Sequence, residues 1–231
     1  MTADTPRPTR RNEGKWFTTM QRHFRITRFA AINRLIETLL AGRETITILD
    51  VGGRAEYWNM LAPQLREKVH VTLLNYGDEL ALFSEHVAAG LRFTNVAGNA
   101  CNMPQYADGS FDLVHSNSVV EHVGSYANMF DFANEIRRVG KAYYVQTPNY
   151  WFPIDPHSAS PFLHWLPDPI PRMRFYVGVT RRVDERGAAM RLDGTKMIGR
   201  IFFGALFPDA VHTSERLALV FVSSLIAARG A

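Results

Sequence analysis

The chain has 231 residues, 46% of them hydrophobic, and this size and composition suit one globular domain with a sizeable core. Charged residues make up 21% of the chain, which argues against disorder, and the single cysteine, Cys101, excludes an intrachain disulfide. The amino-terminal residues lack the apolar stretch of a secretory signal, and the longest apolar run, 217–228, is too short to span a bilayer. We therefore expect a cytoplasmic protein.

The net charge of +4 is concentrated at the amino terminus. Residues 1–28 contain seven basic and two acidic residues, whereas the rest of the chain contains 19 basic and 20 acidic residues. We interpret residues 1–25 as a basic, flexible arm that precedes a domain over 26–231. Such an arm can make weak contact with an anionic membrane surface, but the nearly neutral body gives no reason to expect a nucleic-acid partner.

Hydrophobic spacing predicts helices and strands in alternation over the first two thirds of the chain. A helix is expected over 26–40, a strand over 45–50, a short helix near 57–65 and a strand over 69–74. The expected elements that follow are a helix over 79–89, strands over 91–96 and 111–115, a helix over 125–139 and a strand over 141–146. This alternation indicates a parallel, doubly wound sheet.

A proline-rich segment interrupts the alternation. Residues 148–171 contain seven prolines among several aromatic side chains, a composition that disfavours a regular helix or a central strand. We interpret residues 149–195 as an aromatic cap inserted into the domain. A helix over 196–207 and two strand-like runs, near 210–214 and 222–228, follow it. The expected fold class is therefore α/β, a mostly parallel, seven-stranded Rossmann-like sheet with an antiparallel hairpin at its edge.

The first predicted strand ends in an acid and two glycines, Asp50, Gly52 and Gly53. Glycine lets the backbone turn sharply and approach a ligand, because no Cβ stands in the way. An acid at the carboxyl end of a buried strand lies where open α/β sheets bind ligands. Two later strands end in comparable polar segments, at Asn75 and at Gly98-Asn99-Ala100.

These segments, together with Asp108-Gly-Ser-Phe-Asp-Leu-Val114 and the run His115-Ser-Asn-Ser-Val-Val-Glu-His-Val123, resemble the class I S-adenosylmethionine-dependent methyltransferases, in particular the type 11 superfamily. The resemblance implies that S-adenosylmethionine is the cofactor. The residues that it assigns to cofactor binding are Asp50, Gly52, Gly53, Asn75, Asn99, Ala100, Ser116 and Asn117. In this family the acid and glycines hold the methionine end, Asn75 takes the place of the acid that binds the ribose, and Asn99 that of the acid that reaches the adenine amine.

The resemblance also implies an acceptor site. Glu121 and His122 would lie at its floor, and a histidine with a near-neutral pKa can act as a general base. The alternative for both residues is a pair at a helix amino terminus that bonds to backbone. Asn149, Tyr150 and Trp151 would border the acceptor, although packing within the cap also explains the tryptophan. We expect no metal site, since His115, His122, His157 and His164 do not have the spacing of metal ligands.

The function indicated is methyl transfer from S-adenosylmethionine to a small-molecule or lipid/sugar-type acceptor. The alternative is a degenerate domain of the same fold that acts by binding a partner, because Arg54 and Glu56 stand where the family usually has glycines. A nicotinamide-dependent enzyme does not fit, since the Gly-x-Gly-x-x-Gly pattern is missing. The chemical identity of the acceptor and the oligomeric state stay open.

Overall fold

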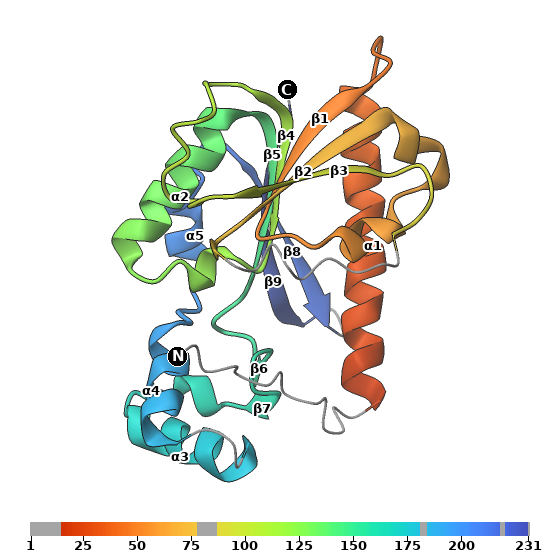
Figure 1. Ribbon diagram of the computed structural model, residues 1–231. Coiled ribbons are helices and arrows are strands. Elements are labelled where there is room, and N and C mark those ends of the chain that lie inside the picture. Colours follow the sequence, from red (N-terminus) through yellow and green to blue (C-terminus); the bar gives the residue numbers. More distant parts are fainter. Residues whose placement is uncertain (1–14, 78–86, 181–183, 218–219, 231) are drawn as a thin grey trace.

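A seven-stranded sheet forms the centre of the computed structural model, which describes residues 15–77, 87–180, 184–217 and 220–230 (Figure 1). The strands are β1 (Ile46–Val51), β2 (Val69–Asn75), β3 (Arg92–Ala97), β4 (Phe111–Asn117), β5 (Gly140–Pro148), β8 (Val211–Leu217) and β9 (Phe221–Arg229). Their order is β3-β2-β1-β4-β5-β9-β8. β1 to β5 are parallel, and β9 runs antiparallel to both β5 and β8. The predicted fold class and edge hairpin are thus confirmed.

Helices cover both faces of the sheet. α1 (Lys15–Leu39) lies on one face, and α2 (Tyr126–Val139) and α5 (Arg200–Leu206) lie on the other (Figure 1). Successive strand side chains point to opposite faces, so one strand feeds two cores. In β1, Ile46 and Ile48 join the core under α1, whereas Leu49 and Val51 join the core under α2 and α5.

The cap forms a lobe beyond the carboxyl end of β5 (Figure 1). It contains a small hairpin, β6 (Ile154–Asp155) and β7 (Ser160–Pro161), and two helices, α3 (Pro169–Thr180) and α4 (Glu185–Asp193). The prediction of no regular helix across the proline-rich segment fails at its end, because prolines are tolerated in the first turn of a helix. Both ends of the insertion are tied together, since Asn149 and Ile198 form a β-bridge and Tyr150 N–H donates to Ile198 O (3.0 Å).

Several element boundaries differ from the predictions. Residues 15–25, predicted as part of the arm, belong to α1, and residues 1–14 lie outside the described residues. The helix expected near 57–65 is replaced by two 3₁₀ helices, η1 (Ala55–Met60) and η2 (Pro63–Lys68), because Pro63 begins a new turn. Most of the helix expected over 79–89 also falls outside the described residues.

The two remaining 3₁₀ helices in the described part of the chain are η4 (Val120–His122) and η5 (Leu163–Trp165). α5 is shorter than predicted because residues 196–198 bond to the sheet and to η4 before the helix begins: Lys196 N–H donates to Glu121 O (2.8 Å). In the ranges that the structure describes, no helix combines the length and apolar character needed to cross a membrane.

Candidate active site

Three of the predicted cofactor segments meet at one edge of the sheet. Val51 of β1 lies beside Leu74 of β2 and beside Ser116 of β4. The residues that come next along these three strands are Gly52, Asn75 and Asn117. Since the carboxyl ends of parallel strands line the ligand crevice of an α/β sheet, these residues occupy the position expected for a cofactor site.

Gly52 turns the chain sharply at the end of β1. Its φ is +71°, and a Cβ at this position would lie 2.5 Å from Cγ2 of Val119, in the segment that follows β4. Gly52 is exposed, so its backbone is open to a ligand. Only glycine permits this conformation and this close approach together.

The carboxylate of Asp50 lies beneath this turn rather than within the crevice. It is fully buried, accepts a hydrogen bond from Nε1 of Trp58 (2.7 Å), and lies 2.7 Å from Nδ1 of His115. A Cβ on Gly53 would overlap the Asp50 carboxylate, so the second glycine is required by this packing. The expected contact of the Asp50 side chain with the methionine portion is therefore corrected, because the acid supports the loop from below.

The side chains of Ser116 and Ala100 are also placed differently from the prediction. Ser116 is buried, and its hydroxyl donates to Val51 O (3.1 Å), which joins β4 to β1. Ala100 packs against the core under α2 and α5. The Ser116 hydroxyl is thus occupied within the sheet, and what the β4 end can offer to a cofactor is its backbone and the residues after it.

Asn75 and Asn99 bond through different atoms of their side-chain amides. Asn75 donates through Nδ2 to Gly53 O (3.1 Å), which fixes the loop and leaves Oδ1 as the acceptor that a ribose hydroxyl would need. Asn99 is exposed and accepts through Oδ1 from Cys101 N–H (3.0 Å). An amide in place of the usual acid is explained at Asn75 by the donor role, which a carboxylate could not fill.

Asn117 lies beside a cation from the first helix. Its Oδ1 accepts a hydrogen bond from Nη1 of Arg28, and both residues line a cavity of about 130 Å³ at the ends of β4 and β5. Arg28 is buried and also pairs with Glu215 of β8 (2.7 Å). No local sequence pattern predicts this arrangement, because Asn117 and Glu215 lie 89 and 187 positions after Arg28.

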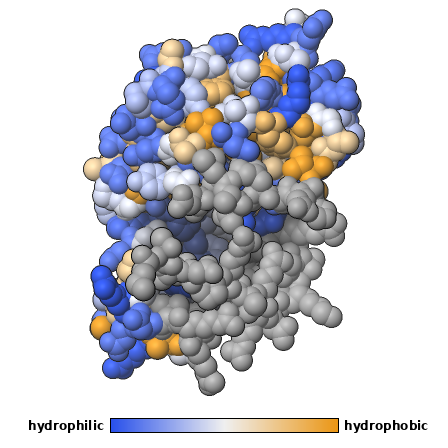
Figure 2. Space-filling view, viewed as in Figure 1, coloured by the Kyte–Doolittle hydropathy of each residue, from blue (hydrophilic) through white to orange (hydrophobic). Residues whose placement is uncertain are grey.

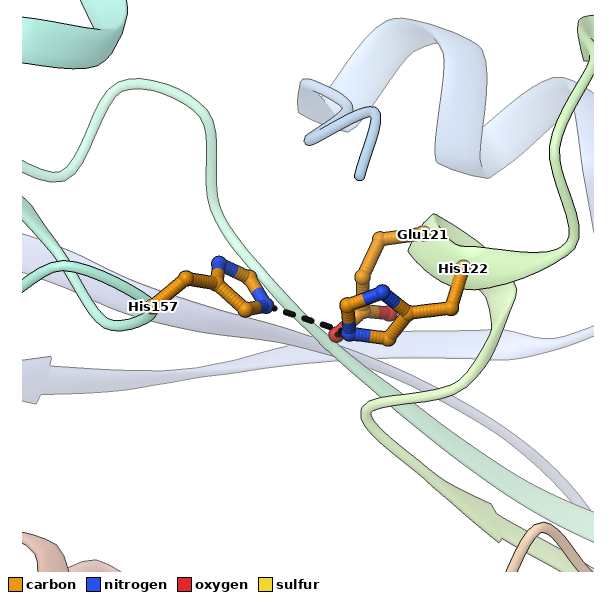
Figure 3. Close-up of side chains that lie close together, drawn as sticks. All are labelled: Glu121, His122 and His157. Carbon is orange, nitrogen blue, oxygen red and sulfur yellow. Dashed lines mark hydrogen bonds and ion pairs between the residues drawn. The ribbon is translucent and has the colours of Figure 1, made fainter. Parts of the chain in front are cut away.

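Glu121 and His122, the predicted catalytic pair, meet a third side chain, His157, from the cap (Figure 3). The Nε2 atoms of the two histidines lie 3.2 Å apart, and Oε1 of Glu121 lies 4.0 Å from Nε2 of His122. Glu121 is fully buried, and its Oε2 accepts from Oγ1 of Thr147 (3.0 Å). Burial raises the pKa of Glu121, partly opposed by the nearby charge of His122.

Nδ1 of each of the two imidazoles lies near an oxygen atom. Nδ1 of His122 lies 3.2 Å from Gly194 O and 3.3 Å from Oγ1 of Thr195, and Nδ1 of His157 lies 3.2 Å from Oδ1 of Asp155. The alternative that Glu121 and His122 only bond to backbone is therefore incomplete. The sequence did not connect His157 with this pair, since 35 positions separate it from His122.

A second cavity, which we call the cap cavity, lies next to this cluster. Its volume is about 260 Å³. The lining residues used below are Tyr126, Tyr150, Asp155, His157, Arg172, Tyr176, Arg191, Thr195 and Lys196. Three basic side chains face one acid there, and the visible surface of the lobe of α3 and α4 is mostly hydrophilic (Figure 2).

Of the three residues predicted to border the acceptor, only Tyr150 lines the cap cavity. Asn149 is buried and donates through Nδ2 to Val222 O (2.9 Å), so it connects the cap to β9. Trp151 is exposed, with its ring 6.2 Å from that of Trp165. The Asn149 side chain thus holds the cap to β9 and the Trp151 side chain lies outside the cavity lining, so, contrary to the prediction, neither lines the cap cavity.

The strand order and the open glycine turn fit the Rossmann-like fold that the sequence predicted. Residues 49–142 match the family model of a methyltransferase domain. This match, over less than half of the chain, agrees with the predicted resemblance to the class I S-adenosylmethionine-dependent methyltransferases. A search of curated proteins found no match.

Solved structures share the fold. An O-methyltransferase family protein from Burkholderia thailandensis is 11% identical, with a TM-score of 0.51 over 89% of this chain and 57% of that one. A Nostoc punctiforme protein assigned as an O-methyltransferase is 13% identical, with a TM-score of 0.50 over 87% and 56%. An exported-protein candidate from Bordetella parapertussis is 15% identical, with a TM-score of 0.51 over 86% and 66%. The chain thus spans 56–66% of the length of these structures.

Proposed function

We propose that the protein transfers the methyl group of S-adenosylmethionine to a small, anionic acceptor that binds in the cap cavity. The observation that carries the choice of acceptor is the charge of that cavity, where Arg172, Arg191 and Lys196 face the single acid Asp155. Guanidinium groups bind carboxylates and phosphates in pairs of charge-assisted hydrogen bonds. The tyrosines of the lining suit a sugar or phenol ring that carries such a group.

The crevice at Gly52 suits the donor. It offers an exposed backbone turn, and the Oδ1 of Asn75 is an acceptor for the ribose. Glu56, where the family usually has a glycine, contributes a buried Oε2 with no hydrogen-bond partner among the described residues. A buried carboxylate oxygen without a partner, four residues after Gly52 in the chain, suits a cationic group such as the ammonium of the cofactor. The departure from the glycine pattern is thus compatible with cofactor binding.

The two sites are joined by a short stretch of chain. Val119 touches the turn at Gly52, and Glu121 and His122 follow two and three residues later, next to the cap cavity. In methyl transfer the acceptor atom attacks the methyl carbon in line, the C–S bond breaks, and its electron pair stays on sulfur. The enzyme must align the reactants and remove the acceptor proton. We assign proton removal to the cluster of Glu121, His122 and His157.

The test begins with the donor. Calorimetry of the purified full chain should show one site for S-adenosylhomocysteine, the demethylated product. No binding up to millimolar ligand would favour the alternative, a degenerate domain that binds a partner. Release of S-adenosylhomocysteine is then measured with a panel of hydroxylated carboxylic and phosphoric acids, each paired with its neutral ester or amide.

We expect turnover with the acids and much less with the neutral counterparts. Arg172→Gln and Arg191→Gln should each raise the KM of the acidic acceptor about tenfold, the loss of one charge-assisted contact, without changing the affinity for S-adenosylhomocysteine. Arg186→Gln, an exposed position of α4 outside the cavity lining, is the matched control. A preference for neutral acceptors would overturn the assignment.

A further inference from the structure

We propose that Glu121, His122 and His157 form a binding site for a divalent transition-metal ion such as Zn²⁺, with an open position towards the cap cavity. Ligand atoms of the three side chains lie within 4.8 Å of one another (Figure 3). The metal site itself does not depend on the proposed function. Only the role of its open position does, because that role requires the acceptor to bind in the cap cavity.

The spacing of the histidine nitrogens suits a metal. Two nitrogens that bind one tetrahedral zinc at about 2.0–2.1 Å lie roughly 3.3 Å apart. The Nε2 atoms of His122 and His157 lie 3.2 Å apart. Oε1 of Glu121 is 4.0 Å from Nε2 of His122, so the carboxylate needs only a small rotation to complete a three-ligand site.

The partners of the two rings leave both Nε2 atoms as acceptors. Gly194 O and the carboxylate of Asp155 can only accept a hydrogen bond, so they favour the tautomers of His122 and His157 that carry the proton on Nδ1, and the Thr195 hydroxyl beside His122 can then also accept. Two neutral imidazoles held in this way direct their Nε2 lone pairs at each other. That arrangement is repulsive unless a proton or a metal cation lies between them, and the buried carboxylate described next favours the metal. Histidines that bind metals are held in this way by a carbonyl or a carboxylate.

The carboxylate supplies a second, independent indication. Oε1 of Glu121 is buried and has no hydrogen-bond partner in the part of the chain that the structure describes. A buried carboxylate oxygen without a donor is costly, and a cation held between it and the imidazoles removes that cost. The set of two histidines and one glutamate is typical of zinc sites that keep a fourth position open, whereas Mg²⁺ and Ca²⁺ prefer oxygen ligands alone.

A cation at this place gives the cluster a defined role in the reaction. His157 lines the cap cavity, and Thr195 joins His122 to the same cavity. An acceptor hydroxyl that binds at the open position becomes more acidic, because the cation stabilises its conjugate base. With the cation bound, the cluster promotes proton removal in this way instead of accepting the proton itself: the proton leaves to solvent, the oxygen attacks the methyl carbon, the C–S bond breaks, and the sulfonium becomes a neutral thioether.

The experiment titrates the chelator-treated full chain with Zn²⁺ in a calorimeter and with Co²⁺ in an absorption spectrometer. One equivalent should bind, and the Co²⁺ complex should show the visible bands of a four-coordinate site. Glu121→Gln and His157→Gln should each weaken Zn²⁺ binding at least tenfold. His164→Gln is the matched control: this histidine also lines the cap cavity, but its Nε2 bonds to Tyr150 O (2.9 Å) and it is not one of the three proposed ligands.

Affinity for S-adenosylhomocysteine and circular dichroism are recorded for each variant, which separates loss of the metal site from loss of the fold. If Zn²⁺ does not bind, or binds His157→Gln as tightly as the parent chain, the metal site is overturned. The cluster is then a proton relay between the two imidazoles, and the proposed function stands on its own tests. If S-adenosylhomocysteine fails to bind while Zn²⁺ binds as expected, the proposed function falls and the metal site does not.

Discussion

Arg28 of α1 and Glu215 of β8 form a buried ion pair across 187 positions of the chain. The contact is bidentate, with Nε to Oε1 at 2.9 Å and Nη2 to Oε2 at 2.7 Å. It connects the first helix to the last hairpin, next to the ends of β4 and β5 where Arg28 also bonds to Asn117. Removing one member of a buried pair leaves the other charge without a partner.

Arg28→Met should therefore lower the free energy of unfolding by about 3–5 kcal/mol, measured by urea denaturation. Arg34→Met, an exposed position on the same helix, is the control and should change it by less than about 0.5 kcal/mol. The double variant Arg28→Met, Glu215→Leu should recover part of the loss. Equal effects of Arg28→Met and Arg34→Met would contradict the role of the pair.

The open turn at Gly52 can be tested against a second glycine of similar conformation. Gly52 has a φ of +71° and Gly42 a φ of +76°, so replacing either with alanine should lower the free energy of unfolding by about 1 kcal/mol through backbone strain. Only at Gly52 does the new Cβ meet Val119, since nothing lies within 4 Å of the Cβ position at Gly42. Gly52→Ala should weaken S-adenosylhomocysteine binding at least tenfold in calorimetry, and Gly42→Ala should leave it unchanged. Comparable affinities in the two variants would place the donor elsewhere.

The two asparagines should respond differently to restoration of the family's usual acid. Asn75→Asp removes the donor to Gly53 O and sets two acceptors against each other, which costs about 1–3 kcal/mol of stability. Asn99→Asp keeps the acceptor for Cys101 N–H and should change stability by less than about 0.5 kcal/mol. Thermal denaturation of both variants checks this. A stabilised Asn75→Asp would show that the Gly53 contact is unimportant.

Asp112 predicts a pH dependence of stability. Burial opposes its ionisation, but hydrogen bonds from Thr47 and the charge of Lys141 lower its pKa to about 2. Because the folded pKa is below the unfolded value of about 3.9, the stabilisation is complete above that value and is lost as the pH falls towards 2. Asp112→Asn should cost on the order of 2 kcal/mol at neutral pH, with a smaller difference near pH 2.

The control for this measurement is Asp108→Asn, since the Asp108 side chain is 83% exposed although it pairs with Arg138. Its stability difference from the parent chain should be small at every pH. A difference for Asp112→Asn that does not change between neutral pH and pH 2 would show that the charge of this carboxylate does not contribute.

Local signals were enough to predict the sheet and its crevice. Each polar or glycine segment directly follows a predicted buried strand, as the glycines follow the strand that contains Asp50. The carboxyl ends of parallel strands meet at one edge of the sheet, so the meeting of these segments follows from the parallel topology. What each side chain does there could not be predicted. The Asp50 carboxylate is buried because it bonds to Trp58 and lies against His115. The Ser116 hydroxyl is buried because it donates to the carbonyl of Val51.

The structure of the cap was much less predictable from the sequence than that of the sheet. Its prolines and aromatics indicated an insertion, but not that Pro169 would begin a helix or that His157 would reach His122. Those outcomes depend on how the lobe folds back onto η4, a long-range arrangement that no periodicity encodes. Two arginines of the insertion, Arg172 and Arg191, line the cap cavity, and the spacing of residues along the chain does not predict that they meet there.

The bridge between Asn149 and Ile198 makes the lobe between them an exchangeable module. Both of its ends leave the body of the protein at one place, so a lobe of different length or sequence can replace it without pulling on the strands. A different lobe would supply different residues to line the cap cavity. The turn at Gly52, Asn75 at the end of β2 and Asn99 after β3 lie outside the lobe and would keep their geometry. Under the proposed function, a replaced lobe would change the acceptor preference, by evolution or by grafting, and would leave the proposed donor crevice intact.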